Sequence, residues 1–135
     1  MIIYILDDIA AFAWYNNKLR WYVVLTKKDA VDFCLTLPGV YEDYPFDEGL
    51  TACMRHEGNR KIFAMIGTHN GFVSISFKNE PSWGDFYRQT YPAIIPGYHC
   101  NKLHWSTLML DGTVPEDVIR HILTQSYDLT APKLK

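Results

Sequence analysis

The sequence predicts one α+β domain in which helices pack on an antiparallel sheet in two layers. Three apolar runs joined by short turns fill the middle of the chain, and helical patterns precede and follow them. Runs of adjacent strands with segregated helices are typical of this class. With 135 residues, of which 48% are hydrophobic, the chain is long enough to bury a core without cross-links. The expected order is α-β-β-β-α-β-β-α, preceded by an N-terminal arm.

The arm, residues 1–25, is predicted to contain two strand-like segments, Ile2–Leu6 and Leu19–Leu25, around a short helix or turn at Ile9–Tyr15. Asn16-Asn17 suits a turn, since Asn tolerates positive φ. The arm is rich in large apolar residues, such as Phe12, Trp14 and Trp21. If they were exposed, they would form an apolar patch of the kind that marks an interface. We therefore expect the arm to dock on its own domain or on a second copy.

The first helix of the domain is predicted to begin after Thr26. Thr26 can cap it, and Asp29 in the first turn favours the helix dipole. Apolar residues then recur at helical spacing until Leu37-Pro38-Gly39 ends the pattern. An irregular acidic loop, Tyr41–Gly49, is expected to follow.

Three strands are predicted next, at Leu50–Arg55, Lys61–Gly67 and Phe72–Phe77. Asn70-Gly71 between two of these apolar runs is a strong hairpin signal. In the third run, serines alternate with large apolar residues. This alternation indicates a sheet with one buried face.

Pro81 opens a second predicted helix, which Pro92 closes, and an extended piece Ala93–Ile95 leads toward a last strand at His104–Leu110. Thr113 with Glu116 three residues later forms a capping-box pattern. The final helix is expected to run to about Tyr127.

The charge is small and unevenly distributed. A net charge of −2 argues against a protein that grips polyanions over its whole surface. Residues 55–102 nevertheless hold more Lys and Arg than Asp and Glu, whereas the 41–49 loop is acidic. The basic middle is consistent with a local surface for an anionic ligand and also with an ordinary mixed, solvated surface.

The cysteines, Cys34, Cys53 and Cys100, are odd in number and form no CxxC pair. This usage favours a reduced, cytoplasmic protein with neither disulfides nor zinc. No apolar run reaches the length of about 20 residues that a membrane span needs, and no secretory signal is visible. We expect no metal, no cofactor and no membrane association.

Four blocks together resemble one known family, the MmcQ/YjbR family. They are DFCLTLPGVYEDYPF (Asp32–Phe46), KIFAMIG (Lys61–Gly67), YPAIIPGYHCNKLHW (Tyr91–Trp105) and SYDL (Ser126–Leu129). The resemblance covers Thr26 to about Leu129 and implies a CyaY-like α+β fold in residues 26–135. It also implies a double-wing DNA-binding function. Residues 1–25 depart from the family pattern, and they are either a true extension or translated upstream sequence.

The segment Ile95–Trp105 gathers the most functional side chains. Pro96-Gly97 fits a type II turn with Gly97 at positive φ, and Asn101 is suited to local backbone hydrogen bonds. Lys102 and His104 are the best candidates for phosphate contacts at a strand entrance. A solvated lysine is an equally good interpretation of Lys102, and we expect Trp105 to pack in the core.

Further cations are candidates for the same anionic surface, although Lys and Arg also occur on edge strands simply to prevent aggregation. The complete predicted nucleic-acid-binding set is Lys102, His104, Arg60, Lys61, Asn101, Arg55 and Lys78. No nucleophile–base pair has a recognisable spacing, so we expect no enzyme. The alternative function is a protein-interaction module, because folds of this order also resemble the type III secretion chaperones.

Overall fold

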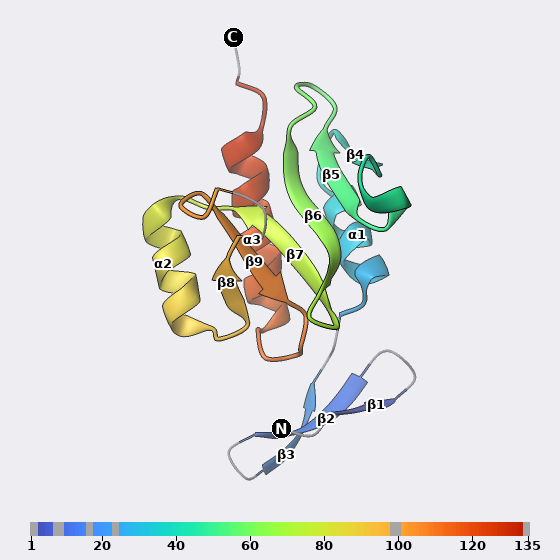
Figure 1. Cartoon of the computed structure of the whole chain (residues 1–135), viewed down its shortest axis with the longest axis vertical. Helices are drawn as coiled ribbons and strands as arrows, with labels where there is room; N and C mark the ends of the chain where they lie inside the picture. The colour runs from blue at the N-terminus through green and yellow to red at the C-terminus, as the bar shows by residue number, and fades with distance from the viewer. Residues whose placement is uncertain (1–2, 7–9, 16–17, 23–24, 98–100, 134–135) are drawn as a thin grey trace.

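The computed structural model describes residues 3–6, 10–15, 18–22, 25–97 and 101–133, with side chains from Leu25 onward outside the gap. It confirms the α+β fold. A six-stranded antiparallel sheet has the order β4-β5-β6-β7-β9-β8, and three helices accompany it (Figure 1). The elements are α1 (Lys27–Leu35), β4 (Val40–Asp43), η1 (Asp47–Gly49), β5 (Ala52–His56), β6 (Ile62–His69), β7 (Phe72–Lys78), α2 (Pro81–Thr90), β8 (Ile94–Pro96), β9 (Trp105–Met109) and α3 (Glu116–Thr130).

The helices lie on one face of the sheet, where the core forms. Ile75 and Phe77 of β7 share that face with Leu108 of β9, because Ile75 and Leu108 are cross-strand partners. Tyr87 of α2 packs edge-on against Phe77, and Ile122 and Leu123 of α3 are buried in the same cluster. Burial of these apolar side chains on one face provides the main stabilisation of the domain.

The predicted burial of only one face of β7 is wrong. Ser74 and Ser76, on the face away from the helices, are only 7% and 8% exposed. Ser76 and Thr107 share a hydrogen bond of 2.9 Å between their hydroxyl groups. Small hydroxyl side chains that satisfy one another can therefore be buried on this second face without loss of hydrogen bonding.

Two predicted elements differ in the structure. The stretch predicted as an irregular acidic loop contains a strand, β4, which pairs with β5 and places Tyr41 opposite Arg55. The helix or turn predicted at Ile9–Tyr15 is instead the strand β2 (Ala10–Tyr15), which pairs with β1 (Ile3–Leu6) and β3 (Lys18–Tyr22). In both places pairing with a neighbouring strand determines the conformation, and local sequence shows such pairing poorly.

The two predicted helix caps also had different outcomes. Thr26 caps α1 as expected, and with Asp29 it forms a full capping box through bonds of 3.1 and 2.9 Å. The capping box expected at Thr113 is wrong, because α3 begins only at Glu116. Thr113 instead bonds Asp111 with both its backbone nitrogen and its hydroxyl.

Candidate nucleic-acid interface

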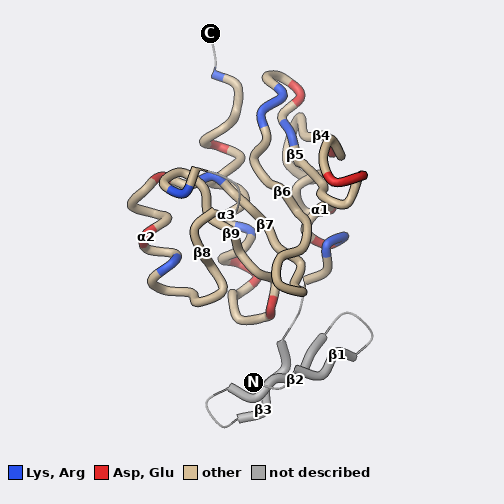
Figure 2. The backbone as a smooth tube through the Cα atoms, viewed as in Figure 1, with Lys and Arg blue, Asp and Glu red and all other residues tan. Residues whose placement is uncertain are grey.

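The antiparallel topology brings the predicted cations to one end of the sheet. Strands β5 and β7 end there, and β6 and β9 begin there, as the pairing of Lys78 with Trp105 and of Arg55 with Ile62 shows. Neighbouring strands lie about 4.8 Å apart, so this row from β5 to β9 is roughly 14 Å wide. We call it the basic end, and its members are Arg55, Arg60, Lys61, Lys78, Lys102 and His104. Figure 2 shows Lys and Arg positions on the β5–β6 hairpin, beside an acidic one.

The β5–β6 hairpin presents two of these cations on a fixed backbone. Arg60 adopts a left-handed conformation with φ of 62°, and its nitrogen donates to the carbonyl of His56 at 2.8 Å. Asn59 accepts from the nitrogen of Lys61 at 3.0 Å and donates to the carbonyl of Thr130 at 2.9 Å. Because Asn59 ties the hairpin to the end of α3, the exposed side chains of Arg60 and Lys61 project from a supported turn.

Arg55, in contrast, has partners within the domain. Its Nε donates to Asp43 Oδ2 at 2.8 Å, and its Nη1 donates to the carbonyl of Arg60 at 2.9 Å. The Arg55 side chain is only 20% exposed. Its guanidinium therefore holds β4 to the hairpin, and this geometry does not favour the predicted phosphate contact at Arg55.

The loop before β9 is organised by Asn101, as the sequence predicts. Asn101 Oδ1 accepts from the nitrogen of Leu103 at 3.0 Å, and its carbonyl accepts from Trp105 at 2.9 Å. Lys102 Nζ donates to the carbonyl of Gly97 at 3.2 Å, although the lysine side chain remains exposed. His104 is half-buried, and His99 and Cys100 lie outside the described residues.

Gly97 is a glycine for a different reason from the predicted one. It is absent from the glycines with positive φ, so the type II turn with Gly97 at positive φ is wrong. Its nitrogen donates to the carbonyl of Trp105 at 2.9 Å. A Cβ atom on Gly97 would lie 2.8 Å from that carbonyl oxygen, so close approach of two backbones requires the glycine.

A buried polar network supports this loop, and sequence reasoning missed it. Asn79 Oδ1 accepts from Ser106 Oγ at 2.7 Å, and Ser106 Oγ accepts from Arg88 Nη1 at 2.7 Å. Arg88 also pairs with Asp85 at 2.9 Å. The backbone nitrogen of Asn79 donates to the carbonyl of His104 at 2.8 Å, which fixes the end of β7 against the end of the loop, where β9 begins. Polar residues at strand ends are too common for sequence alone to have revealed this network.

Lys78 lies at the last position of β7, where Ser126 of α3 replaces a sheet hydrogen bond. The nitrogen of Lys78 donates to Ser126 Oγ at 2.8 Å, and Ser126 Oγ donates to the carbonyl of Phe63 at 2.6 Å. The Lys78 side chain is partly exposed beside Trp105. Ser126 thus positions the backbone from which Lys78 extends.

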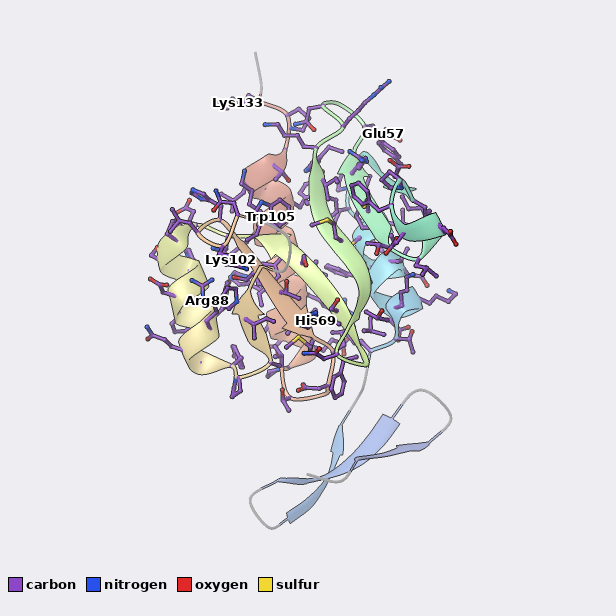
Figure 3. All side chains as sticks on the ribbon, in the orientation of Figure 1. Glu57, His69, Arg88, Lys102, Trp105 and Lys133 are labelled. Carbon is purple, nitrogen blue, oxygen red and sulfur yellow. The ribbon has the colours of Figure 1, made fainter. Side chains whose placement is uncertain are left out.

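Carboxylates also occupy this end of the sheet. Glu80 precedes α2, and Asp128 is exposed near the end of α3. Glu57 is exposed at the hairpin tip (Figure 3). Lys102 and Trp105 are close together in that view, whereas His69 lies at the opposite end of the sheet. The basic end is therefore a mixed surface with a modest cationic excess, which limits the strength of any anion binding.

The described residues hold neither a metal-binding cluster of three His, Cys, Asp or Glu side chains nor a helix long and apolar enough to cross a membrane. Burial raises the pKa of the Cys34 thiol to about 12 and also raises that of Cys53. Both thiols are free and buried, so they are inert core groups.

The YjbR family model matches residues 35–129. The uncharacterized protein YjbR of Escherichia coli K12 is 28% identical over 103 residues, covering 76% of this chain and 85% of the relative. The uncharacterized protein YyaQ of Bacillus subtilis is 30% identical over 118 residues, covering 79% of this chain and 99% of the relative.

Two solved structures show the same fold. The crystal structure of the Deinococcus radiodurans protein DR2400 has a TM-score of 0.72 and 35% identity, over 82% of this chain and 81% of that protein. A crystal structure of a Pseudomonas syringae protein has a TM-score of 0.71 and 25% identity, over 79% of this chain and all of that protein.

Proposed function

This chain belongs to the YjbR family, and from that premise we propose that it binds the phosphate backbone of DNA through the basic end. Two segments make the contacts: the β5–β6 hairpin with Arg60 and Lys61, and the loop before β9 with Lys102 and His104. Lys78 lies between them. The proposal assigns no catalytic activity to the protein.

The observation that carries the proposal is the convergence of these cations from distant parts of the chain. Lys61 and Lys102 are far apart in sequence, yet they flank β7 at one end of the sheet. Phosphate contacts supply most of the affinity in binding without sequence preference, and they need only fixed cations at suitable spacing. The hairpin and the loop are both braced by internal hydrogen bonds, so the cations do not need a folding transition to meet the ligand.

Binding by this surface is expected to be modest and strongly dependent on salt. Glu57, Glu80 and Asp128 share the same end of the domain, and the whole chain has a net charge of −2. With few phosphates neutralised, the logarithm of the binding constant falls with the logarithm of salt at a slope of roughly −0.9 per phosphate. Affinity measured at low salt should therefore be lost near physiological ionic strength.

Titration of the full chain against duplex DNA at two salt concentrations tests the proposal. Lys102→Glu and Arg60→Glu should each weaken binding, because each removes one cation and adds one repulsive charge. Lys28→Glu is the matched control, since Lys28 is exposed on α1 and pairs with Asp32 at 2.6 Å. No binding at low salt, or equal effects of all three substitutions, would reject a DNA-binding basic end.

A protein-interaction module is the second candidate function, and one observation favours it. Trp83 and Phe86 of α2 are 42% and 53% exposed, and their rings meet edge-on with centroids 5.8 Å apart. With Tyr91, Val118 and His121 they line a hollow of about 380 Å³ between α2 and α3. Exposed aromatic clusters of this kind are typical of protein-binding sites.

The two functions can be separated with one pair of variants. If the hollow binds a protein partner, Phe86→Lys should abolish copurification of that partner and leave DNA titrations unchanged. Lys102→Glu should have the reverse effect. If the wild-type protein binds neither DNA nor a protein partner, both functions are contradicted.

A further inference from the structure

The N-terminal arm is a three-stranded antiparallel sheet of its own, with the strand order β1-β2-β3. Its register places Tyr4 opposite Phe12, and Phe12 opposite Trp21. Residues opposite one another share a face, and alternate residues of each strand follow them. The positions on this face, which we call the apolar arm face, are Tyr4, Leu6, Ala10, Phe12, Trp14, Leu19 and Trp21.

The second face of the arm sheet differs in charge, although most of its positions, such as Ile3, Ile5 and Tyr22, are apolar as well. Ala13 lies opposite Arg20, and Tyr15 lies opposite Lys18, so both arm cations occupy positions on this second face. The apolar arm face, in contrast, has no charged position among the described strands. The register thus gathers both cations on one face and leaves the other face uncharged, and a one-residue shift would move them to the other face.

A three-stranded sheet with a wholly apolar face is not stable in water unless a second layer covers that face. Among the described residues, the arm strands pair only with one another and not with the six-stranded sheet (Figure 1). The covering layer must therefore be a surface that is flat, apolar and uncharged.

We propose that the covering layer is the same face of a second copy, so that two arms form a β-sandwich and the protein is a homodimer. A two-fold axis lets one surface complement itself, and this symmetry is the commonest among soluble oligomers. Facing sheets in a sandwich lie about 10 Å apart and interdigitate apolar side chains. Four aromatic positions on each arm, Tyr4, Phe12, Trp14 and Trp21, supply the bulk of that layer.

The area is sufficient for a stable dimer. A buried aromatic side chain removes at least about 150 Å² from water. Four such residues on each of two arms therefore bury on the order of 1,200 Å², which is the lower limit for a standard specific interface. The aliphatic positions add to this area, so the sandwich does not need contacts between the two domains.

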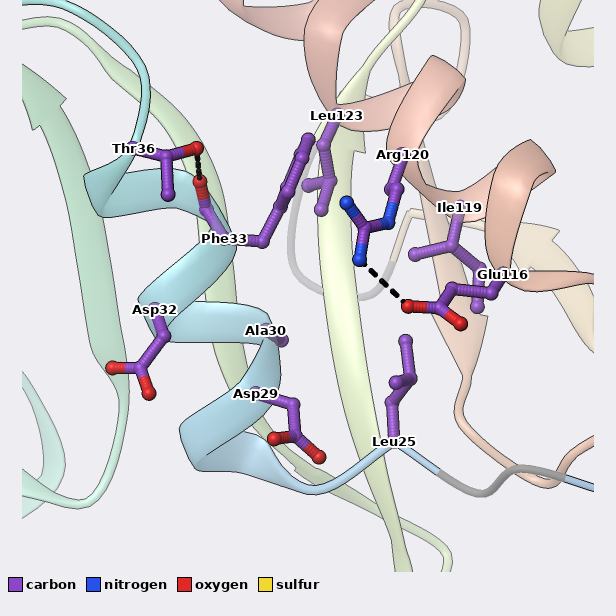
Figure 4. Close-up of a pocket in the computed structure, with 10 residues that line it drawn as sticks. All are labelled: Leu25, Asp29, Ala30, Asp32, Phe33, Thr36, Glu116, Ile119, Arg120 and Leu123. Atoms are coloured by element: carbon purple, nitrogen blue, oxygen red, sulfur yellow. Dashed lines mark hydrogen bonds and ion pairs between the residues drawn. The ribbon is translucent and has the colours of Figure 1, made fainter.

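A groove that includes Leu25, the residue at which the arm ends, is a poorer cover for this face. It is a groove of about 390 Å³ between α1 and α3, with Leu25 at one end (Figure 4). Apolar residues such as Ile119 and Leu123 form part of its lining, but Asp29, Asp32 and Glu116 also line it. Arg120 lines the groove as well and pairs with Glu116 at 2.8 Å. An uncharged sheet face would desolvate these charged groups and offer them no compensating contacts, which disfavours docking there.

Light scattering on the full chain over a dilution series tests the dimer. At high concentration the mass should be twice 15.7 kDa. Phe12→Lys should raise the dissociation constant at least about a hundredfold, because it buries an unpaired ammonium in the apolar layer. Ala13→Lys is the matched control on the second face, and it should leave the mass unchanged.

A second measurement covers the case in which Phe12→Lys unfolds the arm. Tryptophan emission of the wild type should shift to longer wavelength on dilution, together with the fall in mass, as Trp14 and Trp21 become hydrated. A monomer at every concentration overturns the proposal, and so does equal dissociation by both substitutions. A monomer that binds lipid vesicles would identify a membrane surface as the covering layer instead. The DNA titrations above do not depend on the outcome.

Discussion

Arg88 on α2 donates a hydrogen bond of 2.7 Å from Nη1 to Oγ of Ser106 on β9. Ser106 is wholly buried, and its hydroxyl in turn donates to Asn79. A single hydroxyl group thus joins α2, β9 and Asn79, the residue that follows β7. The geometry of the basic end depends on this junction, although Ser106 itself does not reach the surface.

Ser106→Ala should therefore destabilise the domain. The substitution removes the hydroxyl that bonds Arg88 Nη1 and Asn79 Oδ1, which is expected to cost about 1–3 kcal/mol in the free energy of unfolding. Ser82→Ala on the exposed surface of α2 is the control, and it should change stability by less than about 0.5 kcal/mol. Urea denaturation of both variants measures the difference, and equal stabilities would contradict the role of the network.

Substitution of Arg55 should affect mainly the stability of the domain, whereas substitution of Lys61 should affect mainly DNA binding. Arg55→Gln removes the ion pair with Asp43 and should lower the free energy of unfolding by about 1 kcal/mol. Lys61→Gln should leave stability unchanged, because its side chain is exposed. In DNA titrations Lys61→Gln should reduce the salt slope by roughly 0.9, and Arg55→Gln should reduce it little. If Arg55→Gln reduces the salt slope and Lys61→Gln does not, then Arg55 contacts a phosphate and Lys61 does not.

Gly97→Ala should distort the loop before β9. The new Cβ would lie 2.8 Å from both Cβ and the carbonyl oxygen of Trp105, and a backbone carbonyl cannot move aside as a flexible side chain can. We expect a loss of about 1–3 kcal/mol in unfolding free energy, the usual range for overpacking. Pro96→Ala, at an exposed neighbour, is the control for the loss of side-chain bulk. Similar denaturation midpoints for both variants would show that the strand pair tolerates a methyl group here.

His56 should make stability depend on pH. It is 2% exposed, its Nε2 lies 2.8 Å from Thr130 Oγ1, and burial lowers its pKa from 6.5. Below pH 6.5 the unfolded chain gains a proton at this position and the folded chain does not. His56 therefore contributes a loss of stability as pH falls from about 6.5 toward its folded pKa.

His56→Gln should make the decline in unfolding free energy below pH 6.5 shallower than in the wild type. Denaturation midpoints on either side of pH 6.5 measure the slope. His121→Gln, on the exposed surface of α3, should retain the wild-type slope. If both variants behave alike, the pH dependence has another origin.

The two described cysteines should resist alkylation in the native protein. Cys34 and Cys53 are fully buried, and burial raises the pKa of each thiol, so little thiolate forms at pH 8. Mass spectrometry after brief labelling should find both unmodified, whereas all three cysteines of the chain react in urea. Native labelling of Cys34 at the rate seen in urea would mean that the core opens frequently.

The sequence predicts local structure well where neighbouring residues decide it. Thr26 with Asp29 forms the expected α1 cap, and Asn70-Gly71 forms the expected hairpin turn with φ values of 51° and 83°. Asn101 holds its loop through the expected bonds. Each of these features is completed within a few residues, so the pattern and the structure share the same cause.

The sequence by itself determined the α+β class, most helix and strand positions and the presence of cations in the middle of the chain. Only the tertiary structure decided which cations have partners. Arg55 lies 12 residues from Asp43, and Ser106 lies 18 from Arg88, so no local pattern shows these contacts. Strand pairing and helix packing bring such groups together, and they also decide which face of the arm is wholly apolar. The physical reason is that contacts distant in sequence depend on how the whole chain folds, whereas turns and caps depend only on their neighbours.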